Sequence, residues 1–144
     1  LSANRIGDEG VRALANSSHV RSLKRLDLGS NAISDLGACA LAESSHLSSL
    51  EALALHQNYI GDTAARAWAN SPRLSRLDAL ILWGNAISDE GARALAGSAH
   101  LSGLEHLDLR DNLIGPDGAH ALFESPHLMD PSVLSVDTEL ESGP

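Results

Sequence analysis

Histidine recurs in this sequence at a spacing that invites a metal-binding interpretation. The positions His19, His46, His100 and His127 are separated by multiples of 27 residues, and Arg73 stands at the remaining position of the series. Imidazole is a common zinc ligand, but zinc needs ligands that converge on one point. Residues that recur at a constant step are instead translated from one repeated unit to the next. The series therefore predicts a packing role in a repeated loop, and no metal or other cofactor is expected.

A second series of chemically active residues carries charge. Lys24 is followed at the same step by Glu51, Asp78 and Glu105, which places carboxylates on successive units. Such a row could attract a basic partner or a divalent ion, or it could form a solvated rim that supports solubility. We interpret it as the solvated rim, and the other two roles stay open as alternatives.

Covalent catalysis finds little support in the sequence. Serines fall mostly in short polar loops, such as Ser17-Ser18 and Ser44-Ser45, and no G-x-S-x-G motif or phosphate-binding glycine loop occurs. The single cysteine, Cys39, has no partner for an internal disulfide. A non-enzymatic protein in a reducing, cytoplasmic compartment is therefore expected.

The elements that position these residues form a repeat of 27 residues. Each unit contains the motif L-x-x-L-x-L-x-x-N, with an isoleucine two residues after the asparagine. The last two leucines of the motif are Leu26 and Leu28, Leu53 and Leu55, Leu80 and Leu82, and Leu107 and Leu109. Alternation in a strand turns these leucines inward and the residue between them toward solvent. One short strand and one helix per unit are predicted, with the strands paired in parallel.

The repeated asparagines are predicted to be structural. They are Asn31, Asn58, Asn85 and Asn112, and Asn4 begins the series. An interior amide offers two donors and one acceptor, which suffice to bind backbone groups of adjacent units where the chain leaves the sheet.

The repeat resembles a known family. The strand motif and its period resemble the leucine-rich repeats of the ribonuclease-inhibitor-like class, and the helical segments GVRALA (10–15), GACALA (37–42) and GARALA (91–96) are similar to those of bacterial GALA-type repeat proteins. The resemblance implies an α/β solenoid shaped as a horseshoe arc, with a concave parallel β-sheet and convex helices. The class includes enzyme inhibitors, GTPase activators, ubiquitin-ligase receptors and innate-immune sensors, so a protein partner is implied.

The helical segments carry two further predictions. Asp8, Asp35, Asp62 and Asp89 each stand just before a helix, where a carboxylate can cap free N–H groups and favour the positive helix end. Pro116 occupies that position in the fifth unit. Trp68 takes a position that holds leucine in the other units, so we assign it to the core.

The solvent-facing positions of the strand motif define the candidate site. Large side chains gather there on adjoining units, among alanine and glycine, as in a protein-binding hot spot. The candidate residues are His56, Tyr59, Ile81, Trp83, His106 and Arg110. The favoured function is a non-enzymatic module that binds a protein on the concave face. The alternative is a recognition or regulatory fragment of a larger sensor, ubiquitin-ligase receptor or GTPase-activating protein, for which Arg110 is a candidate activating arginine.

The net charge and the length of the chain limit which partners and which domain organisation are expected. The formal charge of −9 repels phosphate backbones, and no 18-residue apolar run suits a membrane span. We expect a leucine-rich-repeat array over 1–128, a degenerate final repeat or cap over 129–136, and an acidic tail over 137–144. The first unit is incomplete and is expected to belong to a longer array. Its Ile6, Val11 and Leu14 are expected to form an uncapped apolar edge, open to self-association or to an upstream domain.

Overall fold

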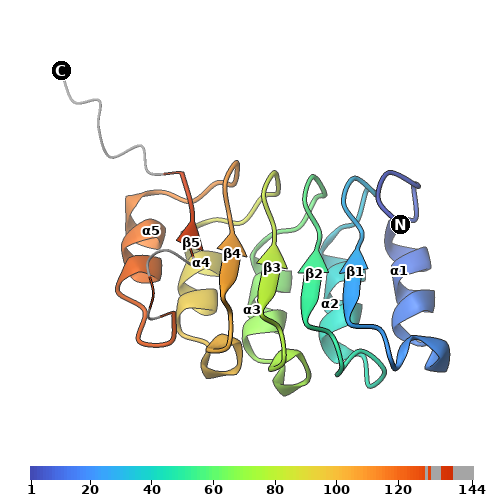
Figure 1. Ribbon diagram of the computed structural model, residues 1–144. Helices are drawn as coiled ribbons and strands as arrows, with labels where there is room; N and C mark the ends of the chain where they lie inside the picture. The colour runs from blue at the N-terminus through green and yellow to red at the C-terminus, as the bar shows by residue number, and fades with distance from the viewer. Residues whose placement is uncertain (129, 131–133, 138–144) are drawn as a thin grey trace.

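The computed structural model describes residues 1–128, 130 and 134–137, and they form a single row of strand and helix units. One parallel sheet has five strands in the order in which they occur along the chain. The helices form a second layer behind it, so the sheet leaves one face uncovered (Figure 1). The strands are β1 (Arg25–Asp27), β2 (Ala52–Ala54), β3 (Ala79–Ile81), β4 (His106–Asp108) and β5 (Leu134–Ser135). The helices are α1 (Gly7–Ala15), α2 (Asp35–Glu43), α3 (Asp62–Ala69), α4 (Asp89–Ala96) and α5 (Pro116–Phe123). Short 3-10 turns follow three of these helices, η1 (Ser18–Val20), η2 (Pro72–Leu74) and η3 (Ala99–Leu101).

The leucines of successive units stack in register inside the solenoid. Leu53 pairs with Leu80, and Leu80 pairs with Leu107, and all three side chains are 0% exposed. Each three-residue strand is too short to bury its own apolar side, so the core exists only because neighbouring units cover one another. The predicted α/β solenoid with a parallel sheet is confirmed. The final strand β5 continues the same register, because Leu134 pairs with Leu107.

Two sequence predictions about the core have different outcomes. Trp68 is 0% exposed, and its indole Nε1–H donates to the Ala38 carbonyl at 3.1 Å, which confirms its place in the core. The predicted apolar edge at the first unit is wrong for Val11, which is 0% exposed. Val11 belongs to the continuous core because α1 already packs against α2, while Ile6 and Leu14 are half-buried at its margin. Among the described residues no helix has the length and apolar character needed to cross a bilayer.

The asparagines form a ladder of hydrogen bonds between units, and Asn31 and Asn58 are buried. The Asn58 Oδ1 accepts from the backbone N–H groups of Asn31 and Ile33, both at 3.0 Å, which belong to the preceding unit. Its Nδ2 donates to Leu28 of that unit at 3.1 Å and to Leu55 of its own at 2.9 Å. Corresponding bonds are made by Asn31, Asn85 and Asn112. The amides therefore bind backbone groups of adjacent units, in the arrangement predicted from the sequence.

The aspartates before the helices cap a different helix from the one predicted. The Asp62 carboxylate accepts from the N–H groups of Ser88 at 2.8 Å and Gly91 at 3.0 Å, which belong to the start of α4, the next helix along the chain. Asp8, Asp35 and Asp89 bind the next helix in the same way. The prediction that each aspartate caps its own helix is therefore wrong. Asp62 is already the first residue of α3, and its side chain reaches across the gap between units.

Glycine makes room for three of these carboxylates where they approach the next helix, at Gly37, Gly91 and Gly118, whereas the corresponding residue in α3 is Ala64. A Cβ atom on Gly91 would lie 2.4 Å from the Asp62 Oδ1 and 2.8 Å from the Ile87 side chain, and Gly118 is similarly crowded by Asp89. The glycine that opens these helical segments therefore keeps adjacent helices close enough to be capped. The structure explains in this way why the G-x-x-A-L-A pattern and the aspartates recur together.

A third ladder, which the sequence analysis missed, is made by buried serines. The Ser98 hydroxyl donates to the Ala69 carbonyl at 2.6 Å, where α3 of the preceding unit ends. Ser44, Ser71 and Ser125 make the same bond to Ala15, Ala42 and Ala96. A free carbonyl at a helix end needs such a donor when it is buried. The signal was the 27-residue recurrence of serine within loops that the sequence analysis treated only as polar.

Acid is expected to weaken the aspartate caps. Burial raises the pKa of Asp62, but hydrogen bonds from the Ser88 hydroxyl and from the Ser88 and Gly91 N–H groups outweigh it, so the pKa lies below its ordinary value of 3.8. The carboxylate therefore stabilises the fold above pH 3.8, and this contribution is lost as the pH falls through the lower folded-state pKa. Asp62→Ala should cost about 2 kcal/mol at pH 7, and the difference from the wild type should shrink toward pH 3.

Urea unfolding at both pH values measures this difference. Asp117→Ala is the matched control, because Asp117 is exposed and makes only a surface ion pair with Arg93 at 3.5 Å. Its cost should stay within about 0.5 kcal/mol at either pH. An Asp62→Ala cost that is the same at pH 7 and pH 3 would show that the carboxylate charge is unimportant.

Candidate protein-interaction surface

The candidate site lies on the uncovered side of the sheet, which we call the sheet face. It consists of the strand residues that alternate with the buried leucines, together with the residue two positions after each strand. Along β3 these residues are Ala79, Ile81 and Trp83, and along β2 they are Ala52, Ala54 and His56. Small alanines form its floor, so the larger side chains stand above their surroundings.

His56 and Trp83 form an aromatic pair on this face. Their ring centroids lie 5.0 Å apart, and the ring planes differ by only 11°. On its other side the imidazole covers Gly29, where any Cβ atom would overlap the ring. Within the described part of the chain the Nδ1 of His56 is buried without a hydrogen-bond partner. The sequence placed these two residues on adjoining units, and the structure brings them into direct contact.

Ile81 and His106 lie on the same face without joining the stack. Ile81 pairs with Ala54 on one side and Asp108 on the other, and it is partly exposed between them. His106 begins β4 and is exposed beside Ala79. Ile81 therefore extends the apolar surface two residues from Trp83, while His106 lies near the edge where the strands begin.

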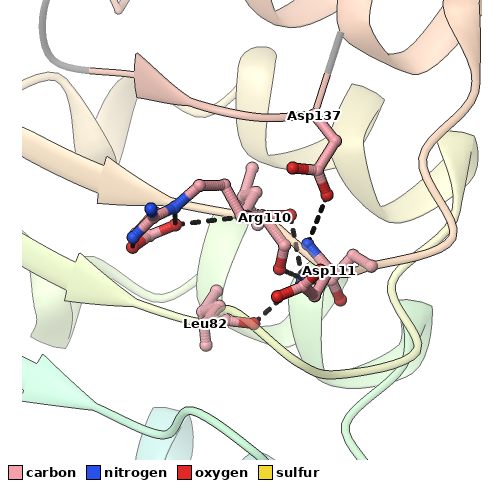
Figure 2. Close-up of polar contacts among 7 residues, drawn as sticks. Leu82, Arg110, Asp111 and Asp137 are labelled. Carbon is pink, nitrogen blue, oxygen red and sulfur yellow. Dashed lines mark hydrogen bonds and ion pairs between the residues drawn. The ribbon is translucent and has the colours of Figure 1, made fainter. Parts of the chain in front are cut away.

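Arg110 is held by a neighbouring carboxylate. Its Nε and Nη2 donate to the two Asp108 oxygens at 2.9 and 2.6 Å, and Figure 2 shows the guanidinium folded back along its own strand. Asp108 is 3% exposed, so the prediction that the residue between the leucines faces solvent is wrong in this unit. Burial raises the pKa of Asp108, but the hydrogen bonds and the charge of Arg110 lower it by more. The pKa therefore lies below its ordinary value, and the carboxylate is kept ionised.

The turn after Arg110 is joined to the last described residues. The Asp111 N–H donates to the Asp137 carboxylate, and the Leu82 carbonyl accepts from Asn112 Nδ2 at 2.9 Å (Figure 2). Asp137 is the first residue of the predicted acidic tail, whose remaining residues, 138–144, lie outside the described part of the chain. Asp137 is therefore held against the turn that follows β4.

Tyr59 lies apart from the other candidate residues. It follows the asparagine turn and pairs with Ser34 in an isolated parallel bridge, and it is 72% exposed. Gln57, in the turn between His56 and Tyr59, has a left-handed backbone with φ of 52°. That turn redirects the chain, so Tyr59 belongs to the loops beside the sheet and not to its strands.

The other chemically active residues do not form a second site. Among the described residues no group of three histidine, cysteine or carboxylate side chains could hold a metal ion. His19 and His100 lie in the 3-10 turns η1 and η3, and both are exposed, so the predicted packing role is wrong for these two residues. Burial, Asp35 and Glu43 all raise the pKa of Cys39, which keeps its thiol protonated and unreactive.

The helix side carries ordinary surface polarity. Arg66 pairs with Glu90 at 3.3 Å, across the gap between α3 and α4, and both side chains are exposed. A shallow open depression between α2 and α3 is lined by Glu43, Ala67, Asn70 and Arg73, among others. Exposed ion pairs of this kind contribute about 0–1 kcal/mol each. The ion pair and the depression therefore present mostly polar or small side chains.

The fold and the ladders define a repeat protein in which each unit supplies one strand of a shared sheet and one covering helix. A family model described as Leucine Rich repeat matches residues 1–15, 19–42, 77–96 and 100–123, which together are more than half of the chain. The chain belongs to the leucine-rich-repeat family. No curated protein is significantly similar to it in sequence. Leucine-rich repeats generally mediate protein–protein interactions, which fits the uncovered sheet face.

Proposed function

We propose that this chain is a non-enzymatic module that binds a protein partner on its sheet face, the concave side of the solenoid. The observation that supports this most directly is the His56–Trp83 stack. A tryptophan that is partly exposed on a floor of alanines, and held by a ring 5.0 Å away, loses little conformational freedom on binding. Tryptophan is also the residue type most enriched in binding hot spots. Ile81 adds apolar area on the same strand.

Trp83 is the central residue of the proposed binding surface. Of the six candidate residues, Ile81 and His56 lie close enough to enlarge the surface that Trp83 presents, whereas Tyr59 is offset beyond the turn. Arg110 has its guanidinium bound to Asp108, which weakens the GTPase-activating alternative, since an activating arginine must be free to reach the phosphate. Burial of the apolar surface of Trp83 and its neighbours is therefore the expected driving force for binding.

We also assign the repeats to the ribonuclease-inhibitor-like class with GALA-type helices. The 27-residue step of the asparagine bonds and an α-helix of eight or nine residues in each of α1 to α5 support this assignment. A cytoplasmic location stays a prediction, and localisation of the tagged protein in cells of its source would check it.

Trp83→Ala is expected to abolish most binding while leaving the fold intact. Peptides selected from a random 12-residue library on the wild-type protein should bind this variant about 30-fold more weakly, as is typical of a hot-spot tryptophan. The melting temperature should fall by less than about 3 °C, since the side chain lies outside the core. Fluorescence anisotropy of the labelled peptides measures the first quantity, and circular dichroism measures the second.

Leu36→Ala provides the matched control. Leu36 is 73% exposed on α2, so it is an accessible apolar residue on the helix layer, away from the sheet face. Its replacement should change neither peptide affinity nor stability. The proposal fails if the selected peptides bind the Trp83 and Leu36 variants equally well, or if no peptide is enriched.

A further inference from the structure

Glu51, Asp78 and Glu105 form a row of carboxylates at the edge of the sheet face where β2, β3 and β4 begin. Strict alternation of side chains along a strand would have turned them inward, on the side of the buried leucines. The backbone N–H groups of Asp78 and Ala79 both donate to the Glu51 carbonyl, at 2.8 and 3.1 Å. One carbonyl thus accepts from two successive residues, which departs from the regular parallel ladder although the register of the strands stays one-to-one. The same doubled bond links Glu51 and Ala52 to Lys24, and Glu105 and His106 to Asp78. The acidic residue and the residue that follows it can therefore both face solvent.

The charges of this row are balanced at one end only. Lys24 binds Glu51 at 2.9 Å, and the hydrogen bond and charge of this lysine lower the pKa of Glu51. Asp78 and Glu105 take part in none of the four ion pairs found among the described residues, and both are exposed. They lie on adjacent strands, whose spacing is about 4.8 Å. Two carboxylates that project from adjacent strands favour a cation between them, and a guanidinium has enough N–H donors to bind both.

The rest of the sheet face does not neutralise this pair. Arg110 is engaged with Asp108, and Lys24 with Glu51. Arg25, on β1, lies two strands away from Asp78. Arg76 precedes Asp78 in the loop before β3, and its charge acts on Glu51. The protein as a whole has a formal charge of −9, which favours approach of a basic partner.

Asp78 and Trp83 are joined by a single strand. Trp83 follows Asp78 by five positions, which is about 16 Å along an extended strand. The doubled bond at Asp78 interrupts the regular alternation, so the carboxylate and the indole are both accessible on the sheet face. Ala79 and Ile81 lie between them and leave a low apolar floor. The face thus offers an anionic position at one end and an apolar anchor at the other.

We propose that the partner docks a basic segment along β3. Its arginine or lysine lies between Asp78 and Glu105, and an apolar side chain about 16 Å away packs against Ile81 and Trp83. This inference rests on the proposed function of the sheet face. The acidic pair gives the segment its direction, because reversing it would place its cation against the indole end and leave both carboxylates uncompensated.

A divalent cation fits the acidic pair less well than a basic side chain does. Calcium takes six to eight oxygen ligands, and magnesium needs a near-octahedral set. Asp78 and Glu105 are only two ligands, and among the described residues no group of three such side chains could hold a metal ion. A guanidinium needs only the two carboxylates that are present.

Peptides selected from the random 12-residue library on the wild-type protein test this inference. The selected sequences should share an arginine or lysine at a constant distance from an apolar residue. Asp78→Asn with Glu105→Gln should weaken their binding about tenfold, and so should raising NaCl from 50 to 500 mM. The matched control is Glu9→Gln with Glu124→Gln, which removes the same charge from exposed positions on the helix side and should leave affinity within about twofold.

The outcomes separate the two proposals. Peptides that need Trp83 but bind the Asp78 and Glu105 double variant as tightly as the wild type would overturn the basic segment and leave the proposed function standing. Peptides that do not need Trp83 would overturn both. An equal loss in the helix-side control would show that net charge alone is responsible, and would also overturn the basic segment.

Discussion

Asn58→Ala is expected to lower the free energy of unfolding by about 3–5 kcal/mol. The Asn58 Oδ1 is the hydrogen-bond acceptor for the N–H groups of Asn31 and Ile33 at 3.0 Å, and these groups are buried. Alanine would leave both donors without a partner, at about 1–3 kcal/mol each, together with the carbonyls that Nδ2 now binds. Urea unfolding followed by circular dichroism measures the total.

Amide hydrogen exchange gives this prediction a local readout. The N–H groups of Asn31 and Ile33 should exchange faster in the Asn58→Ala variant than in the wild type under native conditions, because their acceptor is gone. Asn70→Ala is the matched control. Asn70 ends α3, is exposed, and contributes its backbone N–H to the helix end, so this change should cost less than about 0.5 kcal/mol. Equal costs for the two variants would contradict the role assigned to the ladder.

Trp68→Ala is expected to be about as damaging, at about 3–5 kcal/mol. The side chain is 0% exposed, and its Nε1–H donates to the Ala38 carbonyl of the preceding unit. The variant would lose both the apolar burial of the indole and a contact between units. Trp68→Leu should cost less than half as much, since leucine occupies the same position in the other units and fills part of the cavity.

The two tryptophans should have opposite effects. Trp83→Ala is expected to lose binding and keep stability, whereas Trp68→Leu should lose stability and, below its melting temperature, keep peptide affinity. Because the chain contains only two tryptophans, each variant leaves one fluorescent indole. The Trp83→Ala protein should emit at the shorter wavelength typical of a buried ring. Equal stability costs for Trp68→Ala and Trp83→Ala would show that this division between core and surface is wrong.

Much of the fold could be predicted because the same inward position recurs at a constant step. The register of Leu53, Leu80 and Leu107, the asparagine ladder and the burial of Trp68 all follow from strand alternation and from the period. These features require only that each unit lie on an identical neighbour. No particular distance between side chains has to be known.

The errors arose at contacts that the repeating residue pattern does not record. Asp62 caps α4 and not α3, because its side chain spans the gap between helices, which sequence proximity does not reveal. Asp108 is buried because Arg110 folds back over it, an interaction specific to that unit. The doubled backbone bonds at the starts of β2, β3 and β4, where Asp78 and Glu105 are exposed, also leave no mark in the residue pattern.

For the candidate site, too, some features could be predicted from the sequence and others could not. The sequence by itself determined that Trp83 and His56 face solvent on neighbouring units, since alternation and period decide which side of a strand a residue occupies. Only the tertiary structure decided that the two rings stack, that Tyr59 lies beyond the turn and that Arg110 is engaged. The physical reason is that the period fixes only the side of the sheet on which a side chain lies. Whether two side chains touch depends on the spacing of the units and on the room beside them, such as the space that Gly29 leaves for the His56 ring.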